Sequence, residues 1–228
     1  MRQIVLDTET TGLEPEQGHR IIEIGAVEII DRELTGETFH TYLNPQREID
    51  QRALEVHGIN ADFLAGKPLF ADISEAFVAF IRDAELVIHN APFDVAFLDR
   101  ELSLLSDSAP QISELCKVTD SLALAKHNYP GRKNGLDTLC RRFNVDNSAR
   151  EHHGALLDAE ILAEVYLAMT GGQTALFASP QEPGIEARAW LDFDPLPASR
   201  PRLKVVQASA EELAEHERMM ALVAAASG

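Results

Sequence analysis

The sequence predicts an α/β protein, in which a mixed central sheet is flanked by helices and followed by an extended, proline-rich tail. Three observations predict this architecture. Apolar runs of strand length dominate the first 43 residues, and segments with helical spacing then alternate with a short apolar run up to about residue 170. From residue 179 to residue 201, five prolines fall in a stretch without apolar periodicity, which is typical of an extended linker.

The first three strands are expected to form an antiparallel meander. Residues 3–6 are a short apolar run that ends at Asp7, and residues 21–30 are rich in β-branched side chains. Residues 39–43 form the third run, directly before an Asn-Pro pair. A fourth, short strand of the buried type is expected over residues 86–88.

Apolar residues at helical spacing predict the helices that cover this sheet. Pro92 would lie in the first turn of one of them, where proline is tolerated. The longest is expected to stop at Gly171 and Gly172. Ser209 and Glu212 have the spacing of a capping box, which predicts a terminal helix after the tail. Together with this terminal helix, the expected helices contain residues 73–81, 95–105 (the one with Pro92), 136–143 and 157–167 (the longest).

Composition narrows the class of protein. The 228 residues include 37 acidic and 20 basic side chains, a formal charge of -17, so the chain is poorly suited to hold polyanions by itself. If it acts on nucleic acid, a partner must deliver the substrate; alternatively, the acidity only keeps the protein soluble.

Two separated cysteines, Cys116 and Cys140, cannot build a disulfide framework or a zinc ribbon. No membrane span or secretion signal is recognisable, and a reducing cytoplasm is the expected location.

Two carboxylates are expected to converge at the end of the first strand. Asp7 and Glu9 are two residues apart, and side chains at this spacing in a strand point to the same face. The pair alone is common by chance in so acidic a chain. The residues that follow strengthen the prediction of a functional site. They are Thr10, Thr11 and Gly12, which are expected to form a small, hydrogen-bonding turn that can approach a ligand closely.

Two further carboxylates and a histidine occupy later segments. Asp94 falls at the start of a predicted helix, where it could instead only stabilise the helix N-terminus. Asp158 lies beside the apolar stripe of the longest helix, and solvated surface is the alternative for it. His153 must lie in the loop before that helix if it is to share a site with Asp158. There it could act as a general base, a role typically worth about 10²- to 10⁴-fold in rate, although a surface or capping role is the default for one of eight histidines.

Four carboxylates from three segments would make a hard, oxygen-rich site. Such a site suits Mg²⁺ or Mn²⁺ rather than zinc or copper. Two such ions about 4 Å apart can activate a water and stabilise the leaving oxygen of a phosphoryl displacement. The ions would also neutralise carboxylates that otherwise repel one another.

Three segments resemble a known family. They are Asp7-Thr-Glu-Thr-Thr-Gly-Leu13, His89-Asn-Ala-Pro-Phe-Asp94 and His153-x-x-x-x-Asp158, in this order. They are similar to the three exonuclease motifs of the histidine branch of the DEDD superfamily, and most similar to the epsilon, or proofreading, subunits of bacterial DNA polymerase III. The resemblance extends through residues 135–143 and 153–166 and covers about residues 1–172. The sister branch carries a tyrosine in place of His153 and is therefore excluded.

The resemblance implies an RNase H-like fold with two bound Mg²⁺ or Mn²⁺ ions. Asp7, Glu9 and Asp158 would surround one ion, with Asp7 also touching the second, and Asp94 would support the site. His153 would deprotonate the attacking water. The implied contacts to the terminal nucleotide and the cleft come from Thr10, Gly12, Leu13, Asn90 and His57, although the segment around His57 could equally be a helix end.

The resemblance also implies partners. Residues 173–177, Gln173-Thr-Ala-Leu-Phe177, resemble the peptide with which bacterial replication proteins dock on the sliding clamp (beta), and Leu176 and Phe177 would be its apolar anchors. Trp190 lies in an aromatic cluster of the tail that is expected to contact the polymerase catalytic (alpha) subunit; a transiently collapsed linker is the alternative. The expected organisation is an exonuclease domain over residues 1–172, the clamp peptide over 173–177, and a flexible polymerase-binding tail over 178–228.

The leading hypothesis is a proofreading 3′-to-5′ exonuclease that removes mismatched nucleotides from the 3′ end of DNA. A related exoribonuclease that trims RNA ends or short oligoribonucleotides is the first alternative, because the metal site does not discriminate sugars. A non-catalytic adaptor between clamp and polymerase is the second. The intact set Asp7, Glu9, Asp94, His153 and Asp158 argues against an adaptor.

Overall fold

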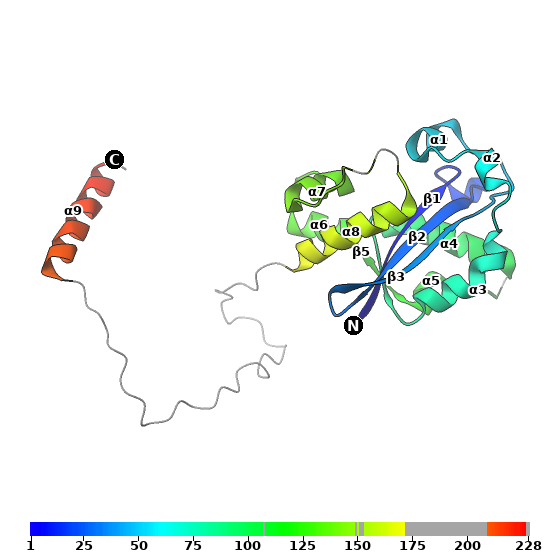
Figure 1. The fold of residues 1–228 in the computed structure, drawn as a ribbon, viewed down its shortest axis with the longest axis horizontal. Helices are drawn as coiled ribbons and strands as arrows, with labels where there is room; N and C mark the ends of the chain where they lie inside the picture. Colours follow the sequence, from blue (N-terminus) through cyan, green and yellow to red (C-terminus); the bar gives the residue numbers. More distant parts are fainter. Residues whose placement is uncertain (107, 149, 151–152, 172–208, 227–228) are drawn as a thin grey trace, which may run out of the picture. The chain divides into compact units, whose positions relative to one another are not determined.

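The computed structural model describes residues 1–106, 108–148, 150, 153–171 and 209–226. The chain divides into two compact units, Met1–Phe177 and Ala178–Gly228. The first unit contains a five-stranded mixed sheet and the helices that cover it (Figure 1). The α/β fold expected from the sequence is therefore confirmed.

The sheet has the strand order β3-β2-β1-β4-β5. The first three strands form the expected antiparallel meander, and β4 and β5 extend it in parallel pairing. The first strand extends past the apolar run of residues 3–6 to Thr10, so Asp7 and Glu9 both lie in its last part, as expected, and both are paired with β2. The strands are β1 (Arg2–Thr10), β2 (Ile21–Ile30), β3 (Glu33–Tyr42), β4 (Glu85–Ile88) and β5 (Lys117–Asp120).

Two groups of helices enclose the sheet. In Figure 1, α3, α4 and α5 lie together on one side of the strands, and α6, α7 and α8 lie on the other. The four helices expected from apolar spacing in the first unit are present as α3, α4, α7 and α8. The helices of this unit are α1 (Gln51–His57), α2 (Ala61–Leu64), α3 (Phe70–Ile81), α4 (Ala91–Leu105), α5 (Ile112–Leu115), α6 (Ser121–Asn128), α7 (Leu136–Phe143) and α8 (Ala155–Thr170), with a 3₁₀ turn η1 at Pro15–Gln17.

Strand alternation divides the core between these two groups. In β1, Ile4 and Leu6 pack with the core of α3, α4 and α5, whereas Val5 packs with that of α6, α7 and α8. Side chains of a strand point alternately to the two faces, so Asp7 and Glu9 follow Val5 toward α8, and Thr8 follows Leu6 toward α4. This alternation determines which helix each site residue can meet.

A glycine lets α8 approach the sheet next to Asp7. Gly25 of β2 is the cross-strand partner of Asp7. A Cβ atom at Gly25 would lie 2.1 Å from the backbone nitrogen of Leu156, so any side chain there would displace the first turn of α8. A glycine inside a strand often marks such a close backbone approach. The N-terminus of α8 therefore lies directly over the strand pair that carries Asp7.

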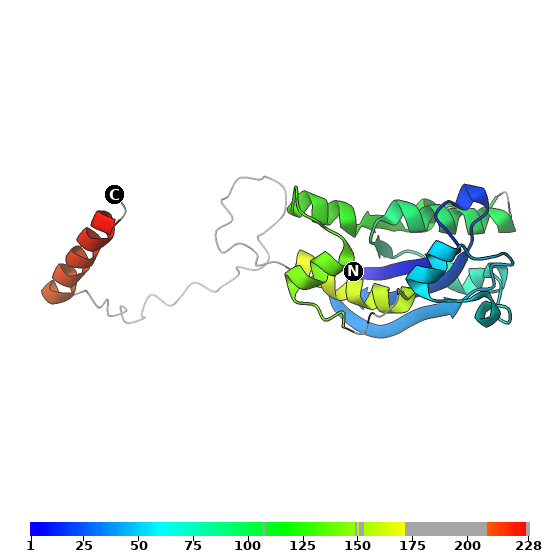
Figure 2. The same ribbon diagram turned by 90° about the horizontal axis from the view of Figure 1, so that it is seen from above.

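The hairpin of β2 and β3 bends around this region. Its register shifts between Val27 and Ile29, which is the sign of a bulge. Bulges bend a strand and increase its twist, and the edge of the sheet is strongly curved in Figure 2.

The second unit contains one described helix, α9 (Ala210–Ala226). The capping box expected at its start is present: the Ser209 backbone N–H donates to Oε2 of Glu212 at 2.7 Å, and the Glu212 N–H donates to Oγ of Ser209 at 3.3 Å. Residues 173–177, which are expected to dock on a sliding clamp, and Trp190 lie outside the described residues. Among the described helices, none is long and apolar enough to cross a membrane.

Candidate active site

Asp94 comes to the sheet from the first turn of α4. Asn90 precedes this helix in the left-handed conformation, at φ 73° and ψ 50°, which turns the chain sharply from the end of β4 into α4. Asp94 is only 3% exposed, and its Oδ1 accepts a hydrogen bond from the Thr8 hydroxyl at 2.7 Å. Its role is therefore not limited to stabilising the helix N-terminus, because the Thr8 hydrogen bond connects it to the strand of Asp7 and Glu9.

Asp158 lies in the first turn of α8 and is 3% exposed. The alternative of solvated surface for this residue was wrong, because the close contact at Gly25 turns this part of α8 toward the sheet. Three side-chain nitrogens contact it: Nε of Arg150 lies 2.5 Å from Oδ1, and Nη2 of Arg150 and Nδ1 of His153 lie 2.7 and 3.2 Å from Oδ2. His153 precedes the helix, as its spacing from Asp158 requires.

A buried glutamate holds the start of this helix in place. Oε2 of Glu23, in β2, accepts the backbone N–H of Ala155 at 3.1 Å, and Oε1 lies 2.8 Å from Nε2 of His40. Glu23 is 2% exposed and is the cross-strand partner of Glu9. A carboxylate at a helix N-terminus satisfies a free N–H and is favoured by the helix dipole. It thereby fixes the position from which Asp158 projects.

One cleft of about 420 Å³ collects the expected catalytic set. Asp7 and Glu9 come from β1, Asp94 from α4, and His153 and Asp158 from the start of α8. Asn90 also lies in its wall. The further lining residues include Thr8, His89, Phe93, Asp137, Arg141 and Arg150.

The cleft contains more carboxylates than its positively charged side chains neutralise, and the pKa of most of these carboxylates is raised. Burial, followed by repulsion from the other carboxylates, raises the pKa of Asp7 well above its ordinary value and that of Glu9 to about 8. Burial raises the pKa of Asp94 to about 7, against the hydrogen bond from Thr8. Asp158 differs: burial alone would raise its pKa, but hydrogen bonds from His153 and Arg150 lower it. Because the other three carboxyl groups have raised pKa values, all of them are ionised at neutral pH only when positive charge is bound beside them.

The donor set fits a divalent metal ion. Glu9, His153 and Asp158 each offer one ligand atom, and these atoms lie within 4.8 Å of one another. Carboxylate oxygens are the typical ligands of Mg²⁺ and Mn²⁺, whereas an imidazole nitrogen is more typical of zinc and the later transition metals. The mutual repulsion seen at Asp7 and Glu9 is what a bound cation would relieve.

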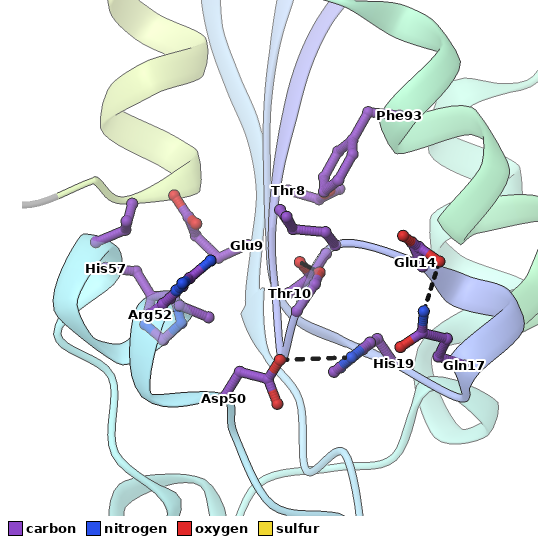
Figure 3. Close-up of a pocket in the computed structure, with 14 residues that line it drawn as sticks. Thr8, Glu9, Thr10, Glu14, Gln17, His19, Asp50, Arg52, His57 and Phe93 are labelled. Atoms are coloured by element: carbon purple, nitrogen blue, oxygen red, sulfur yellow. Dashed lines mark hydrogen bonds and ion pairs between the residues drawn. The ribbon is translucent and has the colours of Figure 1, made fainter.

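A second pocket of about 400 Å³ adjoins the first and shares Thr8, Glu9 and Phe93 with it. Figure 3 shows its walls, formed by the end of β1, the following turn and α1. Leu13 is 75% exposed at this pocket. The residues expected to contact a terminal nucleotide, Thr10, Gly12, Leu13 and His57, all line it.

Two of these residues are fixed by their surroundings. A Cβ atom at Gly12 would lie 2.2 Å from the ring of His19, so glycine is required for the turn to pass this histidine. His57 ends α1, and its Nδ1 accepts the backbone N–H of Ile59 at 3.0 Å. His57 is therefore a helix end that also lines this second pocket, and its contact with a nucleotide stays a prediction.

Several residues of the site were missed in the sequence. No local sequence pattern marks Thr8, Glu23 or Arg150 as part of a site. Each of them acts through a hydrogen-bond partner, and these partners lie 86, 132 and 8 positions away in the chain. Gly25 could have been found, because an isolated glycine in a β-branched run indicates a close backbone approach.

Comparison with known proteins identifies the family. The family model described as "Exonuclease" (RNase_T) matches residues 4–166, which contain the whole candidate site. The chain belongs to this exonuclease family. The fold agrees with it: a solved structure of Exonuclease X in complex with 5′ overhanging duplex DNA superposes with a TM-score of 0.60 at 24% identity, covering 75% of this chain and 92% of that one.

Curated relatives within the exonuclease family extend over nearly the whole chain. The DNA polymerase III subunit epsilon of Salmonella typhimurium is 54% identical over 226 residues, which cover 97% of this chain and 93% of the relative. The subunit of the same name from Escherichia coli is 51% identical over the same shares of both chains. The similarity therefore extends beyond the exonuclease domain into the tail.

Proposed function

We propose that this chain is the proofreading 3′-to-5′ exonuclease of a replicative DNA polymerase, hydrolysing mismatched terminal nucleotides from DNA in the cytoplasm. The observation that carries the proposal is the convergence of Asp7, Glu9, Asp94, His153 and Asp158 in one cleft. Identity above 50% to subunits named for DNA polymerase III supports the replicative role.

The residues of the cleft have distinct parts in this proposal. Asp7, Glu9 and Asp158 would hold one Mg²⁺ or Mn²⁺, and Asp7 would also serve a second. When bound, two such ions supply the positive charge that promotes attack by water and stabilises the leaving oxygen. Asp94 keeps the group in place through Thr8, whose hydroxyl donates to it at 2.7 Å.

His153 takes the proton of the attacking water. Its Nδ1 lies 3.2 Å from Oδ2 of Asp158. The tautomer that carries its proton on Nδ1 would donate it to that oxygen, which orients the ring and leaves the lone pair of Nε2 as the base. The side chain is 46% exposed, which gives it access to the cleft.

The adjoining pocket receives the terminal nucleotide. Thr10, Gly12, Leu13 and His57 line it, and Asn90 lies on the catalytic side. Because Leu13 is apolar and 75% exposed, it is suited to contact the terminal base. A mismatched end reaches this pocket more easily than a paired one, since it is already unstacked in part.

A labelled-primer assay tests the reaction and its substrate. With Mg²⁺, a DNA primer with a mismatched 3′ end should be shortened roughly tenfold faster than a matched one, since freeing a paired end costs about 1.4 kcal/mol. RNA of the same sequence should be shortened more slowly. Faster release from RNA would support the exoribonuclease instead, and no release by the wild-type chain would support the adaptor. The Asp158→Ala chain, purified in parallel, controls for contaminating nucleases.

We further propose that residues 173–177 dock on the sliding clamp and that the tail around Trp190 contacts the polymerase catalytic subunit. Replacing both Leu176 and Phe177 by alanine should reduce retention of the chain by immobilised clamp at least about tenfold, because apolar anchors dominate such peptides. Leu213→Ala, an exposed apolar residue of α9, is the matched control. Equal retention of the double variant and the control would rule out this docking site.

A further inference from the structure

Arg150 lines the cleft and makes ion pairs with both Asp158 and Asp137. Its side chain is only 9% exposed, in the loop between α7 and α8. Nε and Nη2 donate to the two oxygens of Asp158 at 2.5 and 2.7 Å, and Nη1 donates to Oδ1 of Asp137 at 2.6 Å. Such a forked, charge-assisted pair is among the stronger side-chain interactions in proteins.

The loop is shaped to present this guanidinium. Asp146 accepts the backbone N–H of Ser148 at 2.9 Å, and the Arg150 N–H donates to the carbonyl of Asn147 at 3.1 Å. The side chain of Asn147 also donates to Asp137 at 3.1 Å. Arg150 is therefore held by the first turn of α7 on one side and by Asp158 of α8 on the other.

The guanidinium and a divalent ion compete for the same atoms. Both carboxylate oxygens of Asp158 are engaged by Arg150, and Asp158 is one of the three residues whose ligand atoms cluster within 4.8 Å. Arg150 also lowers the pKa of Asp7 and of Glu9, so its charge acts on the whole carboxylate group. An ion that binds an oxygen of Asp158 is repelled by the positive charge of the guanidinium beside it, which favours loss of at least one of these two hydrogen bonds.

The guanidinium of Arg150 also contacts His153 and prevents it from acting as a base. Nη2 of Arg150 lies 2.8 Å from Nδ1 of His153. A guanidinium only donates, so Nδ1 must accept, and the ring proton then sits on Nε2. In this arrangement His153 cannot donate from Nδ1 to Asp158, and Nε2 has no free lone pair to accept a proton.

We propose that Arg150 is a positioning residue that acts as a built-in counter-cation: it neutralises the carboxylate cleft until divalent ions displace it, and its departure frees both Asp158 and His153. The inference rests on the proposed metal site. It predicts that Arg150 opposes metal binding while it stabilises the chain in the absence of metal, two effects that a purely structural arginine would not combine.

Calorimetric titration of the intact chain with Mn²⁺, with thermal unfolding in chelator and in Mn²⁺, tests the proposal. Arg150→Gln should bind Mn²⁺ on the order of tenfold more tightly than the wild type, because a charge-assisted hydrogen-bonded competitor is removed. Its melting temperature should fall in chelator, and Mn²⁺ should raise that temperature more than in the wild type. Arg150→Lys keeps the positive charge but not the paired hydrogen bonds to Asp158. Its Mn²⁺ affinity and its melting temperature in chelator should lie between those of the wild type and of Arg150→Gln.

Arg141→Gln is the matched control, since it removes the same charge from the same cleft, where Arg141 makes no ion pair among the described residues. Its Mn²⁺ affinity should change much less than that of Arg150→Gln. Unchanged or weaker Mn²⁺ binding by both Arg150 variants, or an equal gain in Arg141→Gln, would overturn the proposal. A wild-type chain that binds no Mn²⁺ would instead refute the metal site itself.

Discussion

The Asp158→Ala variant is expected to lose 3′-terminal cleavage by on the order of 10³-fold or more while it remains folded. Asp158 contacts both His153 and Arg150 and contributes to the cluster of ligand atoms, so its removal affects the proposed base and the metal site together. Residues that act as one catalytic unit show such large single losses. The measurement is the initial rate on a mismatched DNA primer in Mg²⁺.

Folding of this variant should be nearly unaffected because two effects offset each other. The loss of the Arg150 pair destabilises the chain, but Arg150 retains Asp137, and the repulsion that Asp158 exerts on Asp7 and Glu9 disappears. The free energy of unfolding should therefore change by no more than about 2 kcal/mol. Glu160→Ala, an exposed carboxylate of the same helix, should keep normal turnover. Near-normal turnover in Asp158→Ala would remove this residue from the mechanism.

The second large effect is a loss of stability with rising pH when divalent ions are absent. The pKa of Glu9 is raised from 4.5 to about 8 and that of Asp94 from 3.8 to about 7, so the folded chain binds more protons than the unfolded chain between these limits. Their contribution to stability is complete below the unfolded values and is lost as pH rises through the folded ones. In chelator, the free energy of unfolding should fall by on the order of a few kcal/mol between pH 5 and 8.

Divalent ions should counteract this decline. A bound cation favours the ionised carboxylates, so the stabilisation by Mg²⁺ should grow as pH rises through the same range. Urea unfolding followed by far-UV circular dichroism at each pH measures both effects, and it does not rely on Trp190, which lies in the tail. Glu9→Gln should flatten the slope in chelator, whereas Glu160→Gln should not. A stability that is flat or rises with pH in chelator would contradict the burial of these carboxylates.

Local sequence patterns predicted the elements whose apolar spacing is regular. The β-branched run over residues 21–30 gave the bounds of β2, and Pro92 and Gly171 marked the start of α4 and the end of α8. The pattern failed where an element is short and has no apolar run. Strand β5 has the sequence Lys-Val-Thr-Asp and forms because β4 offers a parallel edge, which no local signal reveals.

The same distinction applies to the candidate site. Asp7 and Glu9 were predictable as a pair because their spacing alone places them on one face of a strand. Their meeting with Asp158 was not derivable from spacing, since it depends on Gly25 admitting α8 to the sheet. Polar Asp7 interrupts the apolar run of β1, although the backbone continues the pairing to Thr10.

The most direct test of the metal site is an anomalous difference map from crystals of the chain soaked in Mn²⁺. Two peaks are expected in the cleft, one among Asp7, Glu9 and Asp158 and the second beside Asp7, with the guanidinium of Arg150 moved off Asp158. A cleft without anomalous density at saturating Mn²⁺, or ions bound only outside it, would contradict the proposal that these carboxylates form a two-ion catalytic centre.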